Sequence, residues 1–134
     1  KIRRHFPDRH FFKQLLMTAG AEGESRIFVV KYHGRIIGGS VCIYSGTTAY
    51  LWFSGGLRKS YALQYPGILS VWKAMSDAKE RGYEHFEFMD VGLPFQRHGY
   101  RDFVLRFGGK QVSTRRWFRF RWSWLNHLLQ RCFD

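Results

Sequence analysis

The sequence predicts a single α+β (α/β) domain with a mixed, mostly antiparallel sheet and helices on both faces. Three β-rich runs separated by short turns, at residues 26–32, 36–44 and 48–54, predict an antiparallel meander. A longer segment at 68–82 has apolar residues at helical spacing. This helix makes a crossover, so the strand after it should run parallel to the third strand. Helices must bury one face on the sheet, which gives a layered fold.

The elements of the first two thirds follow from local signals. Pro7 suits the first turn of a helix over 7–18, and Gly20 is a natural stop. His33 and Gly34 predict a tight turn between the first two strands. Gly82 closes the long helix. The face of the first helix is apolar at Phe11, Phe12, Leu15, Leu16 and Ala19.

The last third predicts alternating short elements. Residues 85–90 read as a fourth strand, 91–99 as a loop, 100–107 as a short helix and 111–121 as a fifth strand. Ser123 is suited to cap a final helix. The apolar face of that helix comprises Leu125, Leu128, Leu129 and Cys132.

The composition is that of a packed and strongly basic protein. Its 134 residues suffice for one well-buried domain, and its 45% hydrophobic and 19% aromatic content excludes a disordered chain. The formal net charge of +12 predicts an anionic partner: phosphates, nucleic acid or an anionic membrane surface. A basic surface balanced by an acidic neighbour is the open alternative.

Neither cysteine, Cys42 or Cys132, has a partner at metal-ligand or redox spacing, which predicts a reducing cytoplasm and no metal. No apolar run approaches the ~20 residues that span a bilayer. We therefore expect a cytoplasmic protein, or one peripheral at the inner membrane face. The chain begins with Lys1 rather than Met, which indicates a piece of a longer protein.

Two segments carry a family resemblance. Residues 85–92 read His-Phe-Glu-Phe-Met-Asp-Val-Gly, and residues 99–109 read Gly-Tyr-Arg-Asp-Phe-Val-Leu-Arg-Phe-Gly-Gly. They resemble the signature of FemAB-like transferases of the GNAT superfamily, an acidic-aromatic strand leading to a Gly and then a short helix reading Phe-Lys-x-x-Phe-Gly. The Tyr-Pro-Gly-Ile-Leu opening of the long helix at 65–69 and its Lys-Glu-Arg-Gly close at 79–82 also fit. The similarity covers residues 25 to 121.

The resemblance implies a GNAT-like domain that transfers an acyl or aminoacyl group to an amine. Acetyl-CoA or aminoacyl-tRNA would be the acyl donor, and some members build peptidoglycan bridges, so a nucleotide-linked cell-wall precursor is a further candidate partner. Family members often have two GNAT-like domains in tandem. The chain, 1–134, then resembles the C-terminal one, with a GNAT-like domain upstream.

Three features depart from the family pattern, and the first of them, Val104, favours an alternative function. The family's Lys in the short helix falls on Val104, and Asp90 stands where the strand end often has a Gly. The segment 58–67 also lacks the Gly-rich repeat whose backbone N–H groups cradle CoA phosphates in typical GNAT enzymes. The alternative is a catalytically inactive GNAT-like module that binds tRNA, anionic lipid or a protein partner.

Three candidate catalytic residues lie at the end of the fourth strand and in the segment after it. Asp90 is a candidate base or amine anchor, although it could instead cap the following loop. His98 is a candidate acid or base, with a solvated loop histidine as the alternative. The resemblance implies that Tyr100 donates to an oxyanion or leaving group, whereas a tyrosine starting a short helix is often half-packed.

Candidate substrate-binding residues flank the predicted strand ends. Ser54, followed by two glycines, allows close backbone approach of a substrate. Arg58 and Lys59 from one loop and Arg101 from the other are the donor-side cations. Tyr65, at the opening of the long helix, is assigned to the same substrate-binding set.

A basic-aromatic segment precedes the C-terminus. Arg115, Trp117, Arg119 and Arg121 alternate onto one predicted strand face, and Trp122 and Trp124 follow. Such a row can track a phosphate backbone or lie on anionic lipid headgroups. The alternatives are a solvated edge strand protected by charge, and packing of the last helix on another part of the protein.

Overall fold

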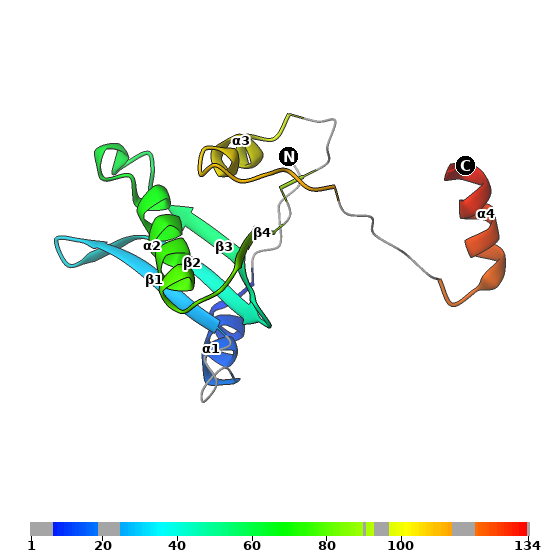
Figure 1. Cartoon of the computed structure of the whole chain (residues 1–134), viewed down its shortest axis with the longest axis horizontal. Coiled ribbons are helices and arrows are strands. Elements are labelled where there is room, and N and C mark those ends of the chain that lie inside the picture. The colour runs from blue at the N-terminus through cyan, green and yellow to red at the C-terminus, as the bar shows by residue number, and fades with distance from the viewer. Residues whose placement is uncertain (1–6, 19–24, 90, 93–96, 114–119, 134) are drawn as a thin grey trace. The chain divides into compact units, whose positions relative to one another are not determined.

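A computed structural model describes residues 7–18, 25–89, 91–92, 97–113 and 120–133 (Figure 1). The chain divides into two compact units, Lys1–Val91 and Gly92–Asp134. The first holds the sheet, and the second holds two helices.

The sheet has four strands among the described residues: β1 Ser25–Tyr32, β2 Arg35–Ser45, β3 Thr48–Gly56 and β4 His85–Phe88. They lie in the order β1-β2-β3-β4. The first three form the predicted antiparallel meander, and β4 pairs with β3 in parallel. The predicted parallel pairing of these two strands is thus confirmed, as is the mixed α+β fold class.

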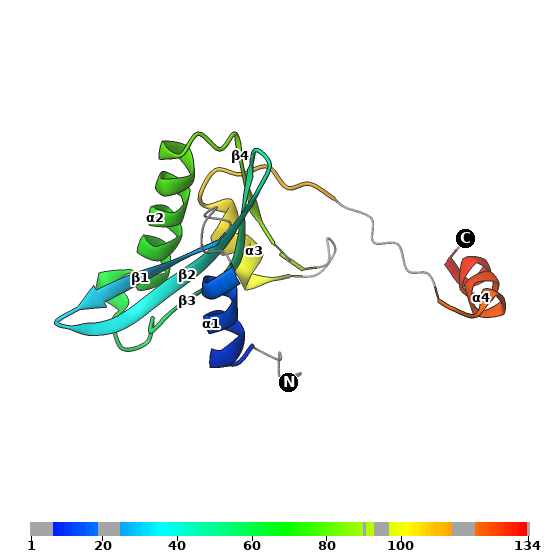
Figure 2. The same cartoon turned by 90° about the horizontal axis from the view of Figure 1, so that it is seen from below.

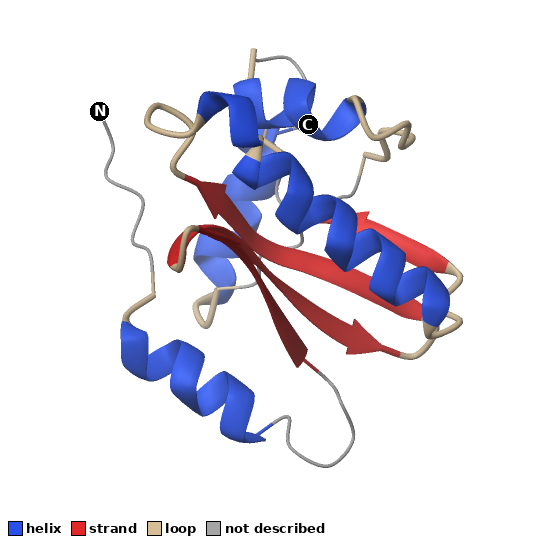
Figure 3. Cartoon of the chain, turned by 90° about the vertical axis from the view of Figure 1, so that its left-hand side faces the viewer, coloured by secondary structure: helices blue, strands red, loops and turns tan. Residues whose placement is uncertain are grey.

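Helices cover both faces of this sheet. The long helix α2, Pro66–Glu80, packs on one face, where the Ser40 hydroxyl donates to the Ser70 carbonyl at 2.9 Å. The helix α1, Arg9–Thr18, contacts the opposite face, where Phe12 meets Phe53 edge to face with ring centroids 5.5 Å apart. Figures 2 and 3 show the two helices on opposite sides of the strands.

The core lies between the sheet and α2. Its side chains come from the two central strands and one stripe of the helix, as the helical spacing of apolar residues predicts. Removing them from water is the main favourable term in folding. The most buried apolar residues are Ile37, Cys42, Ala49, Leu51, Val71 and Ala74.

A charged cluster fixes the C-terminal half of α2 to the sheet. Asp77, which is 7% exposed, accepts a hydrogen bond from the Tyr44 hydroxyl at 3.1 Å and forms an ion pair with Arg26 at 2.8 Å. The Arg81 guanidinium lies over the Tyr44 ring, 4.3 Å from its centroid. Burial, followed by the Asp77 charge, raises the pKa of Cys42 to about 12. Burial likewise raises the pKa of Tyr44, with Cys42 and Asp77 adding to the effect.

The second unit contains α3, Gly99–Leu105, and α4, Ser123–Phe133. At the start of α4 the Asn126 side chain accepts from the Phe120 amide and donates to its carbonyl, both at 2.8 Å. The prediction of a fifth strand over 111–121 is wrong at residues 111–113 and 120–121, which have no regular structure, and residues 114–119 lie outside the described part. None of the described helices is long and apolar enough to cross a membrane.

Candidate functional site

The outer edge of β3 is left without a strand partner near its C-terminal end. The last residue pair between β3 and β4 is Leu51 with Phe88. One further hydrogen bond runs from the Met89 amide to the Leu51 carbonyl at 3.4 Å. Strand β3 nevertheless continues to Gly56. Among the described residues no strand pairs with this edge over 52–56. Edge backbone of this kind offers N–H and C=O groups to a ligand.

A β-bulge coincides with the point where the two strands part. Cys42 pairs with Leu51, whereas its neighbour Val41 pairs with Phe53, so Trp52 is an extra residue in β3. A bulge bends its strand and increases the local twist. This bend accounts for the end of the β3–β4 pairing at Leu51.

The first turn of α2 lies against the end of β3. A Cβ atom added at Gly56 would lie 2.8 Å from the Gly67 amide nitrogen, and one at Gly38 would lie 2.9 Å from the Pro66 carbonyl oxygen. Only glycine allows this approach at both strands. Tyr65 adopts a left-handed conformation with φ of 45°, and Pro66 occupies the first helical turn. The positive end of the helix dipole therefore lies beside the part of β3 that no longer pairs with β4.

Four predicted substrate-binding residues lie along the end of β3 and the loop that joins it to α2: Ser54, Arg58, Lys59 and Tyr65. Ser54 pairs with Ser40 of β2 and lies in the part of β3 beyond its pairing with β4. Arg58 and Lys59 are exposed and follow in the loop, where the Arg58 amide donates to the Gly56 carbonyl at 2.8 Å. The contact between Gly56 and the start of α2 closes this loop, which ends at the 58% exposed Tyr65. The structure thus gathers these four residues along one closed segment, while their roles remain predictions.

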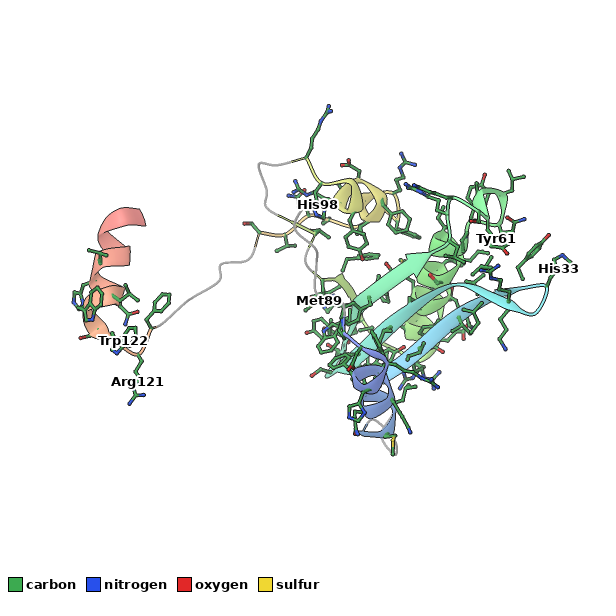
Figure 4. All side chains as sticks on the ribbon, turned by 180° about the vertical axis from the view of Figure 1, so that it is seen from behind. His33, Tyr61, Met89, His98, Arg121 and Trp122 are labelled. Carbon is green, nitrogen blue, oxygen red and sulfur yellow. The ribbon has the colours of Figure 1, made fainter. Side chains whose placement is uncertain are left out.

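The loop is also held against the β1–β2 turn. The Tyr32 ring meets the rings of His33 and Tyr61, with centroids 4.2 and 6.1 Å apart. Figure 4 shows His33 and Tyr61 at this end of the first unit. These contacts restrict the loop that carries the two cations, which reduces the ordering cost of binding a ligand.

A pocket of about 330 Å³ lies on the face of the sheet opposite α2. Phe12 of α1 and Phe53 of β3 form its aromatic wall. Gly39 and Gly55, which pair across β2 and β3, contribute backbone in place of side chains. The other lining residues are Ile27, Ser40, Val41 and Ser54.

The remaining candidate residues belong to other parts of the chain. Asp90 lies outside the described residues, while His98, Tyr100 and Arg101 belong to the second unit. His98 directly precedes α3 and is half-buried, and its ring would lie 2.9 Å from a Cβ atom added at Gly92 (Figure 4). Tyr100, also half-buried, stacks with Phe103 at a centroid distance of 6.1 Å. The roles assigned to these residues remain predictions.

Sequence reasoning missed the bulge at Trp52 and the apolar pocket. The signal in the sequence that could have indicated the pocket is the repeated glycine doublet at 38–39 and 55–56. Its members pair across β2 and β3. The described residues contain no group of three or more metal-ligating side chains.

The chain matches an acetyltransferase family in sequence and solved acetyltransferases in fold. Residues 2–103 match the family described as an acetyltransferase (GNAT) domain. No curated protein sequence matches the chain significantly.

Several solved structures share the fold. Glucosamine-6-phosphate N-acetyltransferase from Arabidopsis thaliana is 13% identical with a TM-score of 0.63, over 89% of this chain and 82% of that one. AAC(6')-Iy in complex with a CoA bisubstrate analogue is 12% identical with a TM-score of 0.64, over 88% and 83%. An aminoglycoside acetyltransferase from an uncultured soil metagenomic sample, in complex with sisomicin, is 17% identical with a TM-score of 0.56, over 87% and 77%.

The match confirms the predicted superfamily, and the narrower FemAB-like assignment remains a prediction. Because the family match covers well over half of the chain and the solved structures share its fold, the chain belongs to the GNAT acetyltransferase domain family.

Proposed function

We propose that this domain transfers an acyl group from an acyl-CoA thioester to a primary amine. Both substrates would meet at the end of β3 that lies beyond its pairing with β4. The observation that carries the proposal is the position of the α2 start beside that strand end, with β4 no longer paired there. A helix start favours anionic groups, and an exposed strand edge offers backbone donors to a carbonyl. One end of the sheet thus combines a phosphate-binding element with an acyl-binding element.

The donor would be held by the segment that joins β3 to α2. Arg58 and Lys59 are exposed cations next to the helix start, suited to the phosphates of CoA. The outer edge of β3 beyond its pairing with β4 is suited to hydrogen-bond the thioester carbonyl, whose oxygen gains negative charge during attack. The thioester itself supplies the activated acyl group.

The acceptor must lose a proton as its nitrogen forms the new amide bond. The new C–N bond replaces the C–S bond, and the proton passes from the amine to the departing thiolate. We assign the base or amine-anchoring role to Asp90, with His98 as a further acid or base and Tyr100 as the proton donor to the leaving group. Arg101 is assigned to an anionic part of either substrate.

Val104 favours a CoA donor over aminoacyl-tRNA. It occupies the position of the lysine that FemAB-like proteins associate with the charged donor, and it is only 6% exposed. A cation is absent at that position, whereas the cations of the β3–α2 segment are exposed. The resemblance to FemAB-like proteins and the amino-sugar substrates named for two neighbours make amino sugars and cell-envelope amines the first acceptors to test.

The direct test combines binding with turnover. CoA should raise the melting temperature of the domain, since a ligand that binds only the folded state stabilises it by mass action. With a panel of amines, acetyl-CoA should release free thiol. Replacing Arg58 or Lys59 by alanine should weaken CoA binding about three- to tenfold. Lys73→Ala is the matched control, because Lys73 is an exposed cation on α2 outside the segment. No CoA response and no thiol release would refute the proposal.

A second candidate is a module that keeps the fold and binds without turnover. The hydrophobic Val104 and the net charge of +12 favour it. It predicts binding of tRNA, of anionic vesicles or of a partner protein through the basic surface, with binding weakened by salt. Salt-sensitive binding to tRNA or to phosphatidylserine vesicles, without thiol release for any amine, would favour this candidate over the enzyme.

A further inference from the structure

We propose that the pocket on the sheet face opposite α2 holds an uncharged, apolar group of a substrate, either an alkyl or an aryl group. The proposal rests on the acyltransferase function proposed above. It names the chemistry of the group that the same strand β3 would select.

The lining of the pocket is apolar and free of charge. Its walls are Phe12, Ile27, Val41 and Phe53, and among the described residues no titratable side chain lines it. Bringing a charged group into such surroundings costs desolvation energy that nothing in the lining repays. An alkyl or aryl group instead gains about 25 cal/mol for each Å² removed from water.

The pocket has the dimensions of a binding subsite. Its volume of about 330 Å³ is at the lower end of the range for ligand sites, which suits one group of a substrate rather than the whole molecule. Phe53 and Gly55 line it from the part of β3 beyond the pairing with β4. A group in the pocket would therefore lie against the strand segment that we assign to the reacting groups.

A single glycine keeps the floor of the pocket open. A Cβ atom added at Gly55 would meet no atom within 4 Å, and its backbone is not in the left-handed region. A larger side chain would therefore fit the strand without strain. Its partner Gly39 differs, since a Cβ atom there would lie 3.0 Å from the Phe28 carbonyl oxygen. Gly39 is thus required by packing, whereas Gly55 leaves space that packing does not require.

Two substrates can supply such a group: the acyl chain of the donor or an apolar part of the acceptor amine. The first arm of the test measures, by titration calorimetry, the affinity for CoA and for its acetyl, butyryl, hexanoyl and octanoyl thioesters. If the pocket takes the acyl chain, affinity should rise about two- to fourfold for each methylene, up to the length that fills the pocket. The second arm measures kcat/KM for a series from methylamine to hexylamine and benzylamine with acetyl-CoA. A similar gain in that arm assigns the pocket to the acceptor.

Gly55→Val tests whether the increase in affinity or kcat/KM with chain length depends on the pocket. In either arm it should flatten the dependence on chain length, with Gly55→Ala having an intermediate effect. Gly109→Val is the matched control that should keep the dependence, since a Cβ atom there also meets no atom within 4 Å. A melting temperature for each variant verifies that the fold is retained.

The outcomes separate this inference from the proposed function. Binding of CoA or release of thiol, with no gain in either arm, overturns the pocket assignment and leaves the transferase intact. A gain that persists undiminished in Gly55→Val also overturns it. Absence of both CoA binding and thiol release refutes the proposed function, and the inference built on it falls as well.

Discussion

Gly56→Ala should move the first turn of α2 away from β3 and weaken CoA binding. The added Cβ atom would lie 2.8 Å from the Gly67 nitrogen and 3.1 Å from the Pro66 ring, whereas ordinary contacts begin at 3.4 Å. The helix start must therefore shift by about 0.6 Å, because the opposing atoms are backbone and a rigid ring. Overpacking of this kind costs about 1–3 kcal/mol of unfolding free energy. For a domain of this size that lowers the melting temperature by about 4–12 °C.

The assay for Gly56→Ala is thermal unfolding together with calorimetric titration of CoA. We expect affinity to fall about three- to tenfold, because the helix start and the strand edge no longer align. Gly55→Ala is the control for stability: its Cβ atom meets no atom within 4 Å, so its unfolding free energy should stay within about 0.5 kcal/mol of the wild type. If Gly56→Ala unfolds and binds CoA as the wild type does, the close packing of α2 on β3 is wrong.

Three further predictions concern the fold that supports the site. Asp77→Ala should lower the unfolding free energy measured in urea by about 2–3 kcal/mol, mostly because the buried Tyr44 hydroxyl loses a charged acceptor. Glu80→Ala, at an exposed position of the same helix, should change it little. Between pH 8 and pH 10, the unfolding free energy of the wild type should fall by about 1.4 kcal/mol more than that of Cys42→Ala. The raised pKa of Cys42 favours the neutral thiol in the folded state, so its contribution is complete below pH 9.0 and lost as the pH rises to about 12; equal losses in both proteins would contradict this. Val104→Lys should destabilise the second unit by about 1–3 kcal/mol, measured by hydrogen exchange in α3, because Val104 is buried.

The sequence was sufficient for most of the architecture because the signals are local. Turn residues such as His33 and Gly34 define the hairpin, and both are in the left-handed region with φ of 46° and 76°. The period of apolar residues identified α2, and its length required a crossover to β4. Observed helix and strand ends lie within two residues of the predicted ones for the four strands and for α1 to α3.

The finer geometry of the site depends on pairings that no local pattern encodes. The bulge at Trp52 exists only in the register between β2 and β3. The hydrogen-bond partners of Asp77, Arg26 of β1 and Tyr44 of β2, lie dozens of positions away in the chain. Asp77 itself reads as an ordinary polar position of a helix. Its role depends on which strand residues the helix covers.

The fifth strand shows the limit of an alternating pattern. Arg115, Trp117, Arg119 and Arg121 recur at every second position, a spacing that places them on one face of a strand. A strand also needs a neighbour to accept its hydrogen bonds. Residues 111–113 form no ladder in the described structure, and Val112 is 75% exposed. At these residues β-propensity without a partner did not produce a strand.

The two ends of α2 are held by different physical means, and this difference bears on the site. At the C-terminal half, Asp77 joins the helix to β1 and β2 through charged and hydrogen-bonded contacts. At the N-terminal end, the absence of side chains at Gly38 and Gly56 allows the backbone to approach. A change at Asp77 therefore removes binding energy between layers, whereas a change at Gly56 displaces the helix start itself. We accordingly expect Asp77→Ala to reduce stability with little effect on CoA affinity below its melting temperature, and Gly56→Ala to reduce both.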